Sequence, residues 1–298
     1  MSNDPSEEET PVAKLRLTRR QWLRRVVGGG LVAGVGMAGY AIGVEPHWLE
    51  FVERDLPIEA LGTDLEGKRL IQISDLHVGP IVDEGYVISA FKTVAQLEPD
   101  LLVLTGDFVT SNADGTPPLE MARRVYSKLK PAGLATVGIL GNHDYGPGWS
   151  SVDSSIAVSA VLRDCGCLML RNSATTVAGL RIVGFEDYWS PLFDRKLMTD
   201  LPVSTKPTLV LCHNPDVVDL PIWANYRGWI LSGHTHGGQC KAPFLSPPRI
   251  PVKNKRYTSG AFDLSDGRQL YINRGLGYSI RVRFNVRPEI TVFTLRRA

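Results

Sequence analysis

The sequence predicts an α/β core built on a mixed sheet or on two packed sheets. Short apolar runs alternate with helical patterns from residue 69 onward, and the later runs follow one another through short links. Asp, Asn or His residues stand directly after five of these apolar runs. The first two observations define the fold class, and the third indicates that polar chemistry gathers at one edge of a sheet.

The elements can be read in order from the spacing of apolar residues. Residues 70–73 form a short strand-like run, and residues 86–97 repeat apolar residues at helical spacing before Pro99. The run at residues 101–104 is apolar throughout, as expected of a strand that is buried on both faces. Further helices are expected at residues 119–129, closed by Pro131, and at 155–162, and further strands at 136–140, 180–185, 209–212, 229–231, 270–273 and 290–295.

The composition is that of an ordinary globular protein. The chain has 298 residues, of which 43% are apolar and 21% charged, and 33 Lys and Arg against 31 Asp and Glu give a net charge of +2. These values exclude long-range disorder, a collagen and an all-helical membrane bundle, and they argue against a nucleic-acid partner bound through bulk positive charge. Four cysteines do not make a disulfide scaffold, and we interpret them as packing residues.

The first 45 residues have the layout of an export signal or an amino-terminal membrane anchor. An acidic start and a basic run that includes Lys14 and Arg16 precede residues 26–44, which carry no charge and contain seven glycines. Residues 18–23, Thr-Arg-Arg-Gln-Trp-Leu, resemble a twin-arginine export signal, which carries folded cargo. A buried core helix is the alternative, and the glycines would destabilise it. We expect residues 46–298 to form one domain.

The sequence is compatible both with cleavage of the amino-terminal segment and with its retention as a membrane anchor. Residues 41–43 form a passable small-residue cleavage site, yet 19 uncharged residues are also enough to span a bilayer. The expected location is therefore outside the cytoplasm, either membrane-anchored or in the periplasm or cell wall. The expected partners of this segment are the twin-arginine export machinery and the membrane surface.

Histidine use is selective. Five of the six histidines lie in short Gly-, Asp- or Asn-rich sequences, and His47 is the exception. These histidines lie in four such sequences, and Gly106-Asp107 is a fifth without a histidine. Each of the five follows an apolar run, so the carboxyl ends of neighbouring strands would bring them into one cluster. The residues delivered in this way are Asp75, His77, Asp107, Asn142, His143, Asp144, His213, His234 and His236.

These residue types suit metal ions. Carboxylate, carboxamide and imidazole groups together fit Mn, Fe or Zn better than Ca or Mg. The carboxylate of Asp107 has two oxygens and is the natural bridge between two cations. His234 and His236 are two residues apart and could each serve a different ion. Any one of the five motifs alone is a common turn, whereas all five in order are not plausibly accidental.

Together the motifs Asp75-x-His77, Gly106-Asp107, residues 141–144, His213 and residues 233–236 resemble those of the calcineurin-like metallophosphoesterases. Residues 233–239, 271–277 and 287–291 are further similar to the YkuE/YaeI-type bacterial phosphodiesterases, which also begin with a twin-arginine-like segment. The resemblance implies an α/β fold with a two-sheet β-sandwich flanked by helices and a dinuclear metal site at one edge. Residues 108–111 lack the extension of the phosphoprotein phosphatases, which argues against protein dephosphorylation.

The resemblance also implies roles for the individual residues. It places a first metal on Asp75, His77, Asp107 and His236, and a second on Asp107, Asn142, His213 and His234. It makes His143 a catalytic residue that stabilises charge and protonates the leaving oxygen, with Asp144 orienting it. The implied reaction is hydrolysis of an envelope phosphoester, on a lipid or a cell-wall polymer, by a hydroxide that bridges two divalent ions of Mn, Fe or Zn.

Alternatives remain for the function. One is a UDP-2,3-diacylglucosamine-type pyrophosphatase of lipid A synthesis, which needs cytoplasmic access that the export signal disfavours. Another is a metal-binding module without turnover, against which His143 argues. Nucleic-acid cleavage would be confined to short oligonucleotides, because the charge is near zero.

Other residues have two readings each. Asn273 and Arg274 either contact the substrate phosphate or form a structural turn. Three arginines form either a basic rim or, as we favour, a solvated strand face: Arg281, Arg283 and Arg287. Four apolar residues either rest on a membrane surface or pack against the domain: Trp48, Leu49, Phe51 and Val52.

Overall fold

The computed structural model describes residues 18–129, 133–200 and 205–298. The predicted basic residues Lys14 and Arg16 and the helix-closing Pro131 lie outside the described residues. The contacts divide the chain after Tyr40, and of the first unit only residues 18–40 are described; the second unit is Ala41–Ala298. Each unit is described by itself below.

The apolar amino-terminal stretch is helical despite its seven glycines. Helix α1 spans Arg19–Gly43. Thr18 and Gln21 cap its start reciprocally, since each side-chain oxygen accepts a hydrogen bond from the other residue's backbone N–H, at 3.2 and 3.0 Å. Among the described residues, α1 is the helix whose length and composition would allow it to cross a membrane, a property that signal sequences and core helices share.

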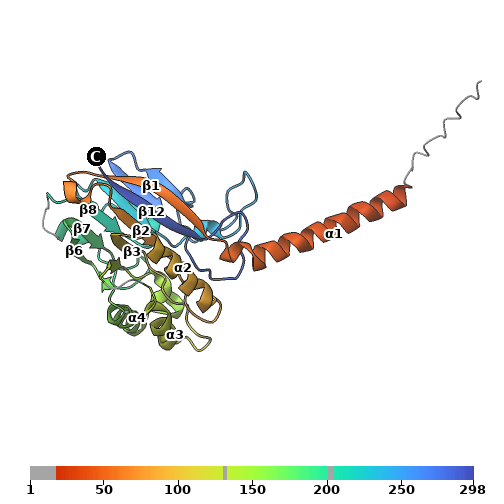
Figure 1. Ribbon diagram of the computed structural model, residues 1–298, viewed down its shortest axis with the longest axis horizontal. Helices are drawn as coiled ribbons and strands as arrows, with labels where there is room; N and C mark the ends of the chain where they lie inside the picture. Colours follow the sequence, from red (N-terminus) through yellow and green to blue (C-terminus); the bar gives the residue numbers. More distant parts are fainter. Residues whose placement is uncertain (1–17, 130–132, 201–204) are drawn as a thin grey trace, which may run out of the picture. The chain divides into compact units, whose positions relative to one another are not determined.

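The first β-sheet is mixed. Its strand order is β1–β12–β2–β3–β4–β5, in which β12 runs antiparallel to β2 and the other neighbours are parallel (Figure 1). Its strands are β1 (Glu50–Ile58), β2 (Arg69–Ile73), β3 (Leu101–Leu104), β4 (Ala135–Gly138), β5 (Leu168–Met169) and β12 (Glu289–Arg297).

The second sheet has parallel central strands and antiparallel edges. Its order is β10–β11–β9–β8–β7–β6, and β10 and β6 are the antiparallel strands. Its strands are β6 (Ser173–Val177), β7 (Leu180–Gly184), β8 (Thr208–Leu211), β9 (Gly228–Ser232), β10 (Gly260–Asp263) and β11 (Arg268–Ile272).

The two sheets pack face to face. Leu70 and Val103 of the first sheet share a buried cluster with Leu209 and Leu231 of the second. The next residue along β2, Ile71, belongs to a different buried cluster on the outer face of the first sheet. Successive strand residues point to opposite faces, so continuous apolar runs are what a sheet covered on both sides requires. The predicted α/β sandwich with flanking helices is confirmed.

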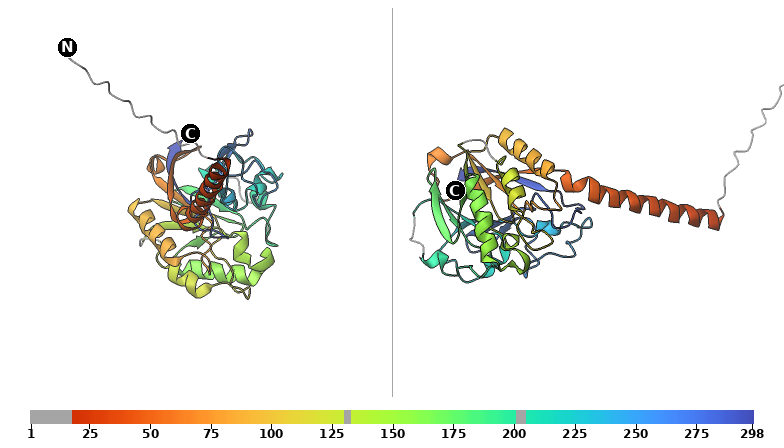
Figure 2. Two further views of the ribbon diagram at one scale, coloured as in Figure 1. Left: turned by 90° about the vertical axis from the view of Figure 1, so that its right-hand side faces the viewer. Right: turned by 90° about the horizontal axis from the view of Figure 1, so that it is seen from below.

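The helices cover the outer face of the first sheet. Figures 1 and 2 show α2, α3 and α4 gathered on one side of it, where their apolar residues join the outer cluster. Asp83 caps α2 by accepting a hydrogen bond from the Tyr86 N–H at 2.7 Å. The α-helices of this unit are α2 (Glu84–Gln96), α3 (Leu119–Tyr126), α4 (Val152–Asp164) and α5 (Leu197–Asp200), and the 3₁₀ segments are η1 (Glu45–His47), η2 (Thr63–Leu65), η3 (Asn142–Tyr145), η4 (Pro147–Trp149), η5 (Pro215–Asp219) and η6 (His236–Gly238).

Several features differ from the expectations or add to them. Strands β1, β5, β6 and β10 were not expected, since they are short or lie at edges and carry exposed residues. The prediction that Arg283 lies on a solvated strand face is wrong, because this residue lies outside the strands and is fully buried.

The apolar residues that follow the amino-terminal helix and the cysteines were given alternative roles above. Trp48 and Phe51 are exposed, and Leu49 packs against the outer cluster. No disulfide joins cysteines of the described residues, and Cys167 and Cys212 are buried in the cores.

Candidate metal centre

The predicted site residues come together at the carboxyl ends of the strands of both sheets. Strands β2, β3 and β4 of the first sheet and β8 and β9 of the second deliver them. Because the sheets face each other, motifs from both halves of the chain meet in one buried cluster. Its buried members are Asp75, His77, Asp107, Asn142, His213, His234 and His236.

The backbone of the cluster is strained. Asp75, His77, Asp107, His234 and His236 have φ angles of 51°, 51°, 54°, 71° and 50°, in the left-handed region. A non-glycine residue there costs on the order of 1–3 kcal/mol and persists only where the surrounding structure imposes it. Five such residues in one cluster are a mark of a functional site.

Two glycines let the backbone approach the carboxylates closely. A Cβ atom on Gly141 would overlap the carboxylate and backbone nitrogen of Asp107. A Cβ atom on Gly233 would overlap the side chains of Ser74 and Asp75. The glycines beside the ligand motifs are therefore required by the packing of the site.

The first group of donor atoms comes from Asp75, His77, Asp107 and His236, which lie within 4.8 Å of one another. The Nε2 atoms of His77 and His236 are 3.0 Å apart. The Nε2 atom of His236 lies 3.2 Å from the Asp75 carboxylate, and that of His77 lies 3.5 Å from the Asp107 carboxylate. Two carboxylates and two imidazoles thus converge on one point.

The second group comes from Asp107, His213 and His234, also within 4.8 Å of one another. The Nε2 atom of His213 lies 3.2 Å from the carboxylate of Asp107, which thereby belongs to both groups. The Oδ1 atom of Asn142 is buried and has no hydrogen-bond partner. An orphaned buried acceptor beside a carboxylate and two imidazoles fits a cation, because each of these groups offers a lone pair.

Hydrogen bonds outside the cluster fix which ring nitrogen each histidine turns inward. The Nδ1 of His213 donates to the carbonyl of Thr105 at 2.6 Å, and the Nε2 of His234 donates to that of Pro251 at 2.9 Å. The Nδ1 of His77 lies 2.9 Å from the Thr110 hydroxyl. Metal-binding histidines characteristically use their second nitrogen in this way, which leaves the first unprotonated for the ion.

The electrostatics of the cluster favour a bound cation. Burial lowers the pKa of both His77 and His234 to about 3, so their imidazoles are neutral near pH 7, as metal ligands must be. Burial raises the pKa of Asp75 to about 6. Burial also acts to raise the pKa of Asp107, but the nearby His213 and His143 outweigh it and hold that pKa well below the usual range.

His143 lies at the border of the cluster and belongs to neither donor group. Its ring is 4.8 Å from that of His77, edge to face, and its side chain is partly exposed. Its backbone N–H donates to the Asp107 carboxylate at 2.9 Å. An accessible imidazole beside two sets of donors is placed to meet a substrate.

Asp144 does something other than what the sequence predicted. Its carboxylate accepts hydrogen bonds from the backbone N–H groups of Phe108 at 2.8 Å, Val109 at 3.1 Å and Gly141 at 2.9 Å. It therefore ties the loop after β3 to the loop after β4. The expectation that Asp144 orients the His143 ring is replaced by a role in holding the backbone that carries Asp107 and Asn142.

Sequence reasoning missed three residues near the cluster. The ring of Trp189 stands edge-on to His234 at 4.5 Å and stacks on Trp149 at 4.5 Å. Asp187 is buried, one of its oxygens has no partner, and burial raises its pKa to about 6. Asp187 follows β7 at the same edge, so the rule that found the other strand ends would have found it.

Asn273 and Arg274 have protein partners. The Asn273 amide donates to Thr291 at 2.8 Å, and its oxygen accepts from the Gly275 N–H at 2.7 Å. Arg274 pairs with the buried Glu289 and with Glu50. These contacts account for a structural turn, and a role in substrate contact stays a prediction.

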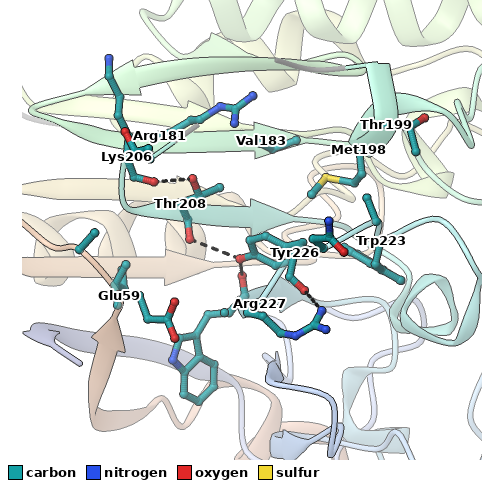
Figure 3. A pocket seen from close by; sticks show the side chains of 17 residues that line it. Glu59, Arg181, Val183, Met198, Thr199, Lys206, Thr208, Trp223, Tyr226 and Arg227 are labelled. Carbon is teal, nitrogen blue, oxygen red and sulfur yellow. Dashed lines mark hydrogen bonds between the residues drawn. The ribbon is translucent and has the colours of Figure 1, made fainter. Parts of the chain in front are cut away.

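A separate cavity of about 560 Å³ lies at the opposite ends of strands β7, β8 and β9. Figure 3 shows Trp223 and Tyr226 in it, with Arg181 and Lys206 on β7 and before β8. Among the described residues that line it, Glu59 is the one carboxylate and none is a histidine. The cavity therefore does not share the donor set of the metal centre.

Residues 68–238 match the family described as calcineurin-like phosphoesterase, and the chain belongs to that family. It is a metal-dependent phosphoester hydrolase with a dinuclear-type site of Asp and His residues. It is 31% identical to the metallophosphoesterase YkuE of Bacillus subtilis, over 94% of this chain and 98% of the relative. It is 28% identical to the phosphodiesterase YaeI of Escherichia coli, over 94% and 99% of the two chains.

A further relative carries a more specific name. The chain is 28% identical to the UDP-2,3-diacylglucosamine pyrophosphatase LpxG of Chlamydia trachomatis, over 83% of this chain and 89% of the relative. The relatives thus include a phosphodiesterase and a pyrophosphatase.

Proposed function

We propose that this protein hydrolyses a phosphodiester of the cell envelope at a centre that holds two divalent metal ions. The observation that carries the proposal is the Asp107 carboxylate, which belongs to two donor groups at once. A carboxylate shared between two clusters of imidazoles and carboxylates is suited to hold two ions side by side.

The assignment of ligands follows the two donor groups. Asp75, His77, Asp107 and His236 would hold the first ion. Asp107, Asn142, His213 and His234 would hold the second, with Asn142 added for its buried, unpartnered oxygen. This set of nitrogen and oxygen donors favours Mn, Fe or Zn. When bound, such ions supply Lewis-acid stabilisation of phosphoryl charge and an activated water.

His143 would act on the leaving group. It sits beside both donor groups without belonging to either, and its ring is accessible. A proton carried on one of its ring nitrogens can pass to the leaving oxygen as the phosphoester bond breaks. Asp107 positions the backbone of His143 through the hydrogen bond to its N–H. The carboxylate that both donor groups share is therefore hydrogen-bonded to the backbone of the proposed proton donor.

The chain's amino-terminal segment bears on where the reaction occurs. We propose that residues 1–45 act as a twin-arginine-type signal or membrane anchor and that residues 46–298 form the catalytic domain. Arg19 and Arg20 begin α1, and the length and composition of that helix fit a membrane span. An envelope phosphoester outside the cytoplasm is the substrate class that agrees with this segment.

A pyrophosphatase acting on a UDP-diacylglucosamine is the second candidate. The similarity to LpxG, over 83% of this chain, favours it. The two candidates predict opposite faces of the membrane for the catalytic domain. Protease accessibility of residues 46–298 in spheroplasts separates them, with an Arg19→Lys, Arg20→Lys variant as the control that blocks twin-arginine export.

The experiment that tests the proposed function is a hydrolysis screen of the metal-loaded full chain. The panel contains an aryl phosphomonoester, an aryl phosphodiester, teichoic acid and UDP-diacylglucosamine. We expect the diester to be hydrolysed and the activity to vanish in Asp107→Asn. Tight metal binding without turnover of any substrate would instead identify a metal-binding module.

A further inference from the structure

Exposed apolar side chains gather on two loops and the chain segment beside them. Phe244 is 103% exposed, Ile280 68% and Leu245 64%, and Ile42 and Val44 are each 51% exposed. We call these five residues the apolar rim. A single exposed apolar side chain is ordinary, whereas several that gather in one place mark a contact surface for a partner outside the chain.

Backbone hydrogen bonds join the segments of the apolar rim. The Lys241 N–H donates to the carbonyl of Phe284, and the Phe284 N–H donates to that of Gln239, both at 2.9 Å. The Arg283 N–H donates to the carbonyl of Ala41 at 2.9 Å. The loops that carry Phe244 and Ile280 are therefore neighbours of each other and of the residues at Ala41.

The same segments are strongly basic. Residues 239–259 hold five Lys or Arg, and residues 275–288 hold three, of which Arg283 is buried; neither segment holds an Asp or Glu, in a chain whose net charge is +2. Arg249 and Arg281 are exposed. Exposed apolar side chains on segments that carry exposed cations and no carboxylate of their own are complementary to one surface in particular, the interface of an anionic bilayer.

The apolar rim is continuous with the metal centre. The Gln239 N–H donates to the carbonyl of His236 at 3.0 Å, and the Gly277 N–H donates to that of Asp75 at 2.7 Å. The buried guanidinium of Arg283 donates to the carbonyls of Gly275 and Gly277. Both loops that carry the rim are thus hydrogen-bonded to the backbone of a residue of the first donor group.

We propose that the apolar rim inserts into the interface of an anionic membrane, so that the metal centre takes phosphoesters whose leaving or retained group is a lipid. The proposal rests on the proposed function and names its substrate class. Chain continuity supports it independently, because Ala41 is where the uncharged stretch of residues 26–44 enters the catalytic unit. Ile42 and Val44 are among the last residues of that stretch, so if it lies in a membrane, they lie where the chain leaves the apolar interior.

Depth in the bilayer tests the insertion without reference to catalysis. The full chain, with Cys165→Ser and Cys240→Ser, is reconstituted into phosphatidylcholine vesicles with and without phosphatidylglycerol. A nitrobenzoxadiazole label is attached at Phe244→Cys or, as the control, at Ile156→Cys, an equally apolar residue that is 52% exposed on α4. We expect a blue shift and quenching by nitroxide lipids at position 244 and neither at 156. Equal behaviour at the two positions overturns the proposal.

Charge dependence is measured on the same vesicles. Phosphatidylglycerol is expected to increase quenching at position 244. Arg249→Gln and Arg281→Gln each weaken that dependence, since one cation near an anionic surface is worth about a fivefold change in binding. Quenching that is the same with and without phosphatidylglycerol contradicts an anionic occupant.

Kinetics then separate this proposal from the proposed function. The ratio of kcat/KM for a diacylglycerol-linked aryl phosphodiester to that for a soluble one should fall about tenfold in Phe244→Ser, Leu245→Ser. If the unsubstituted protein cleaves the soluble ester with a higher kcat/KM than the lipid-linked one, the proposed lipid substrate class is refuted. If the unsubstituted protein cleaves neither ester, the proposed function is refuted, and the fluorescence and quenching at position 244 still test membrane insertion. Ile156→Ser should leave the ratio unchanged.

Discussion

The Nε2 atoms of His77 and His236 face each other at 3.0 Å in a buried cluster. Burial lowers the pKa of His77 to about 3 and that of His236 well below its usual value. Both imidazoles are therefore neutral near pH 7, beside the carboxylates of Asp75 and Asp107. A cation between these groups offsets the buried negative charge and binds the inward lone pairs.

Metal removal should consequently destabilise the protein as well as inactivate it. Dialysis against a chelator is expected to abolish hydrolysis of an aryl phosphodiester and to lower the melting temperature by several degrees. A ligand at 100 times its Kd stabilises a fold by about 2.7 kcal/mol. Adding Mn²⁺ should restore both the hydrolysis activity and the melting temperature. Full activity and an unchanged melting temperature after verified metal loss would falsify the dinuclear assignment.

Asp107 and His143 should be distinguishable by metal content. Asp107→Asn removes the shared charge, so we expect it to lose metal and activity together. His143→Ala should keep its metal and lose about 10²–10⁴-fold in kcat, the usual range for a proton donor. Elemental analysis beside kinetics checks both variants. Metal loss in His143→Ala would make it a ligand, against its position outside both donor groups.

Asp144→Ala should act through the backbone of the two loops. Three backbone N–H groups lose their acceptor, which we expect to cost at least about 2 kcal/mol in the free energy of unfolding. Activity should fall at the same time, because these loops carry Asp107 and Asn142. Asp153→Ala, an exposed carboxylate on α4, is the control. Urea denaturation measures the free energy of unfolding of both variants. Equal stability would contradict the proposal that Asp144 holds the loops after β3 and β4 together.

Gly141→Ala tests the close approach to Asp107. The backbone at Gly141 is extended, so alanine fits its dihedral angles, but the added Cβ overlaps the Asp107 carboxylate. Displacing the shared ligand should lower kcat/KM by about 10²-fold or more. Gly62→Ala has an extended backbone as well and nothing within 4 Å of the added atom, so it should retain full activity. The kcat/KM values of the two variants are measured side by side, and equal values for Gly141→Ala and Gly62→Ala would refute the steric argument.

Arg274→Met addresses the two readings of that arginine. Removing it leaves the buried Glu289 unpaired, so we expect a loss of about 3–5 kcal/mol of stability. The KM of the folded fraction should stay unchanged. Arg195→Met, at an exposed position, serves as the control for loss of charge. A raised KM with unchanged stability would support the substrate contact that the sequence left open.

Most of the fold could be predicted because its signals are local. The run at residues 101–104 had to be a strand covered on both faces, since it is apolar throughout and too short for a helix. Strand β1 (Glu50–Ile58) escaped prediction because its burial is slight and its position beside β12 depends on residues nearly the whole chain away. Arg283 was misplaced for a similar reason, because its carbonyl partners are supplied by loops and not by any sequence pattern.

The sequence by itself determined which residues carry the chemistry, since glycine-flanked Asp, Asn and His residues directly after apolar strands have few other uses. The tertiary structure alone decided how they are grouped. It sets Asp75 beside His236, 161 residues further along the chain, because two sheets pack with their active edges together. It also turned Asp144 toward the backbone and Arg274 toward Glu289. Hydrogen-bond partners are chosen by distance in space, which spacing along the chain does not encode.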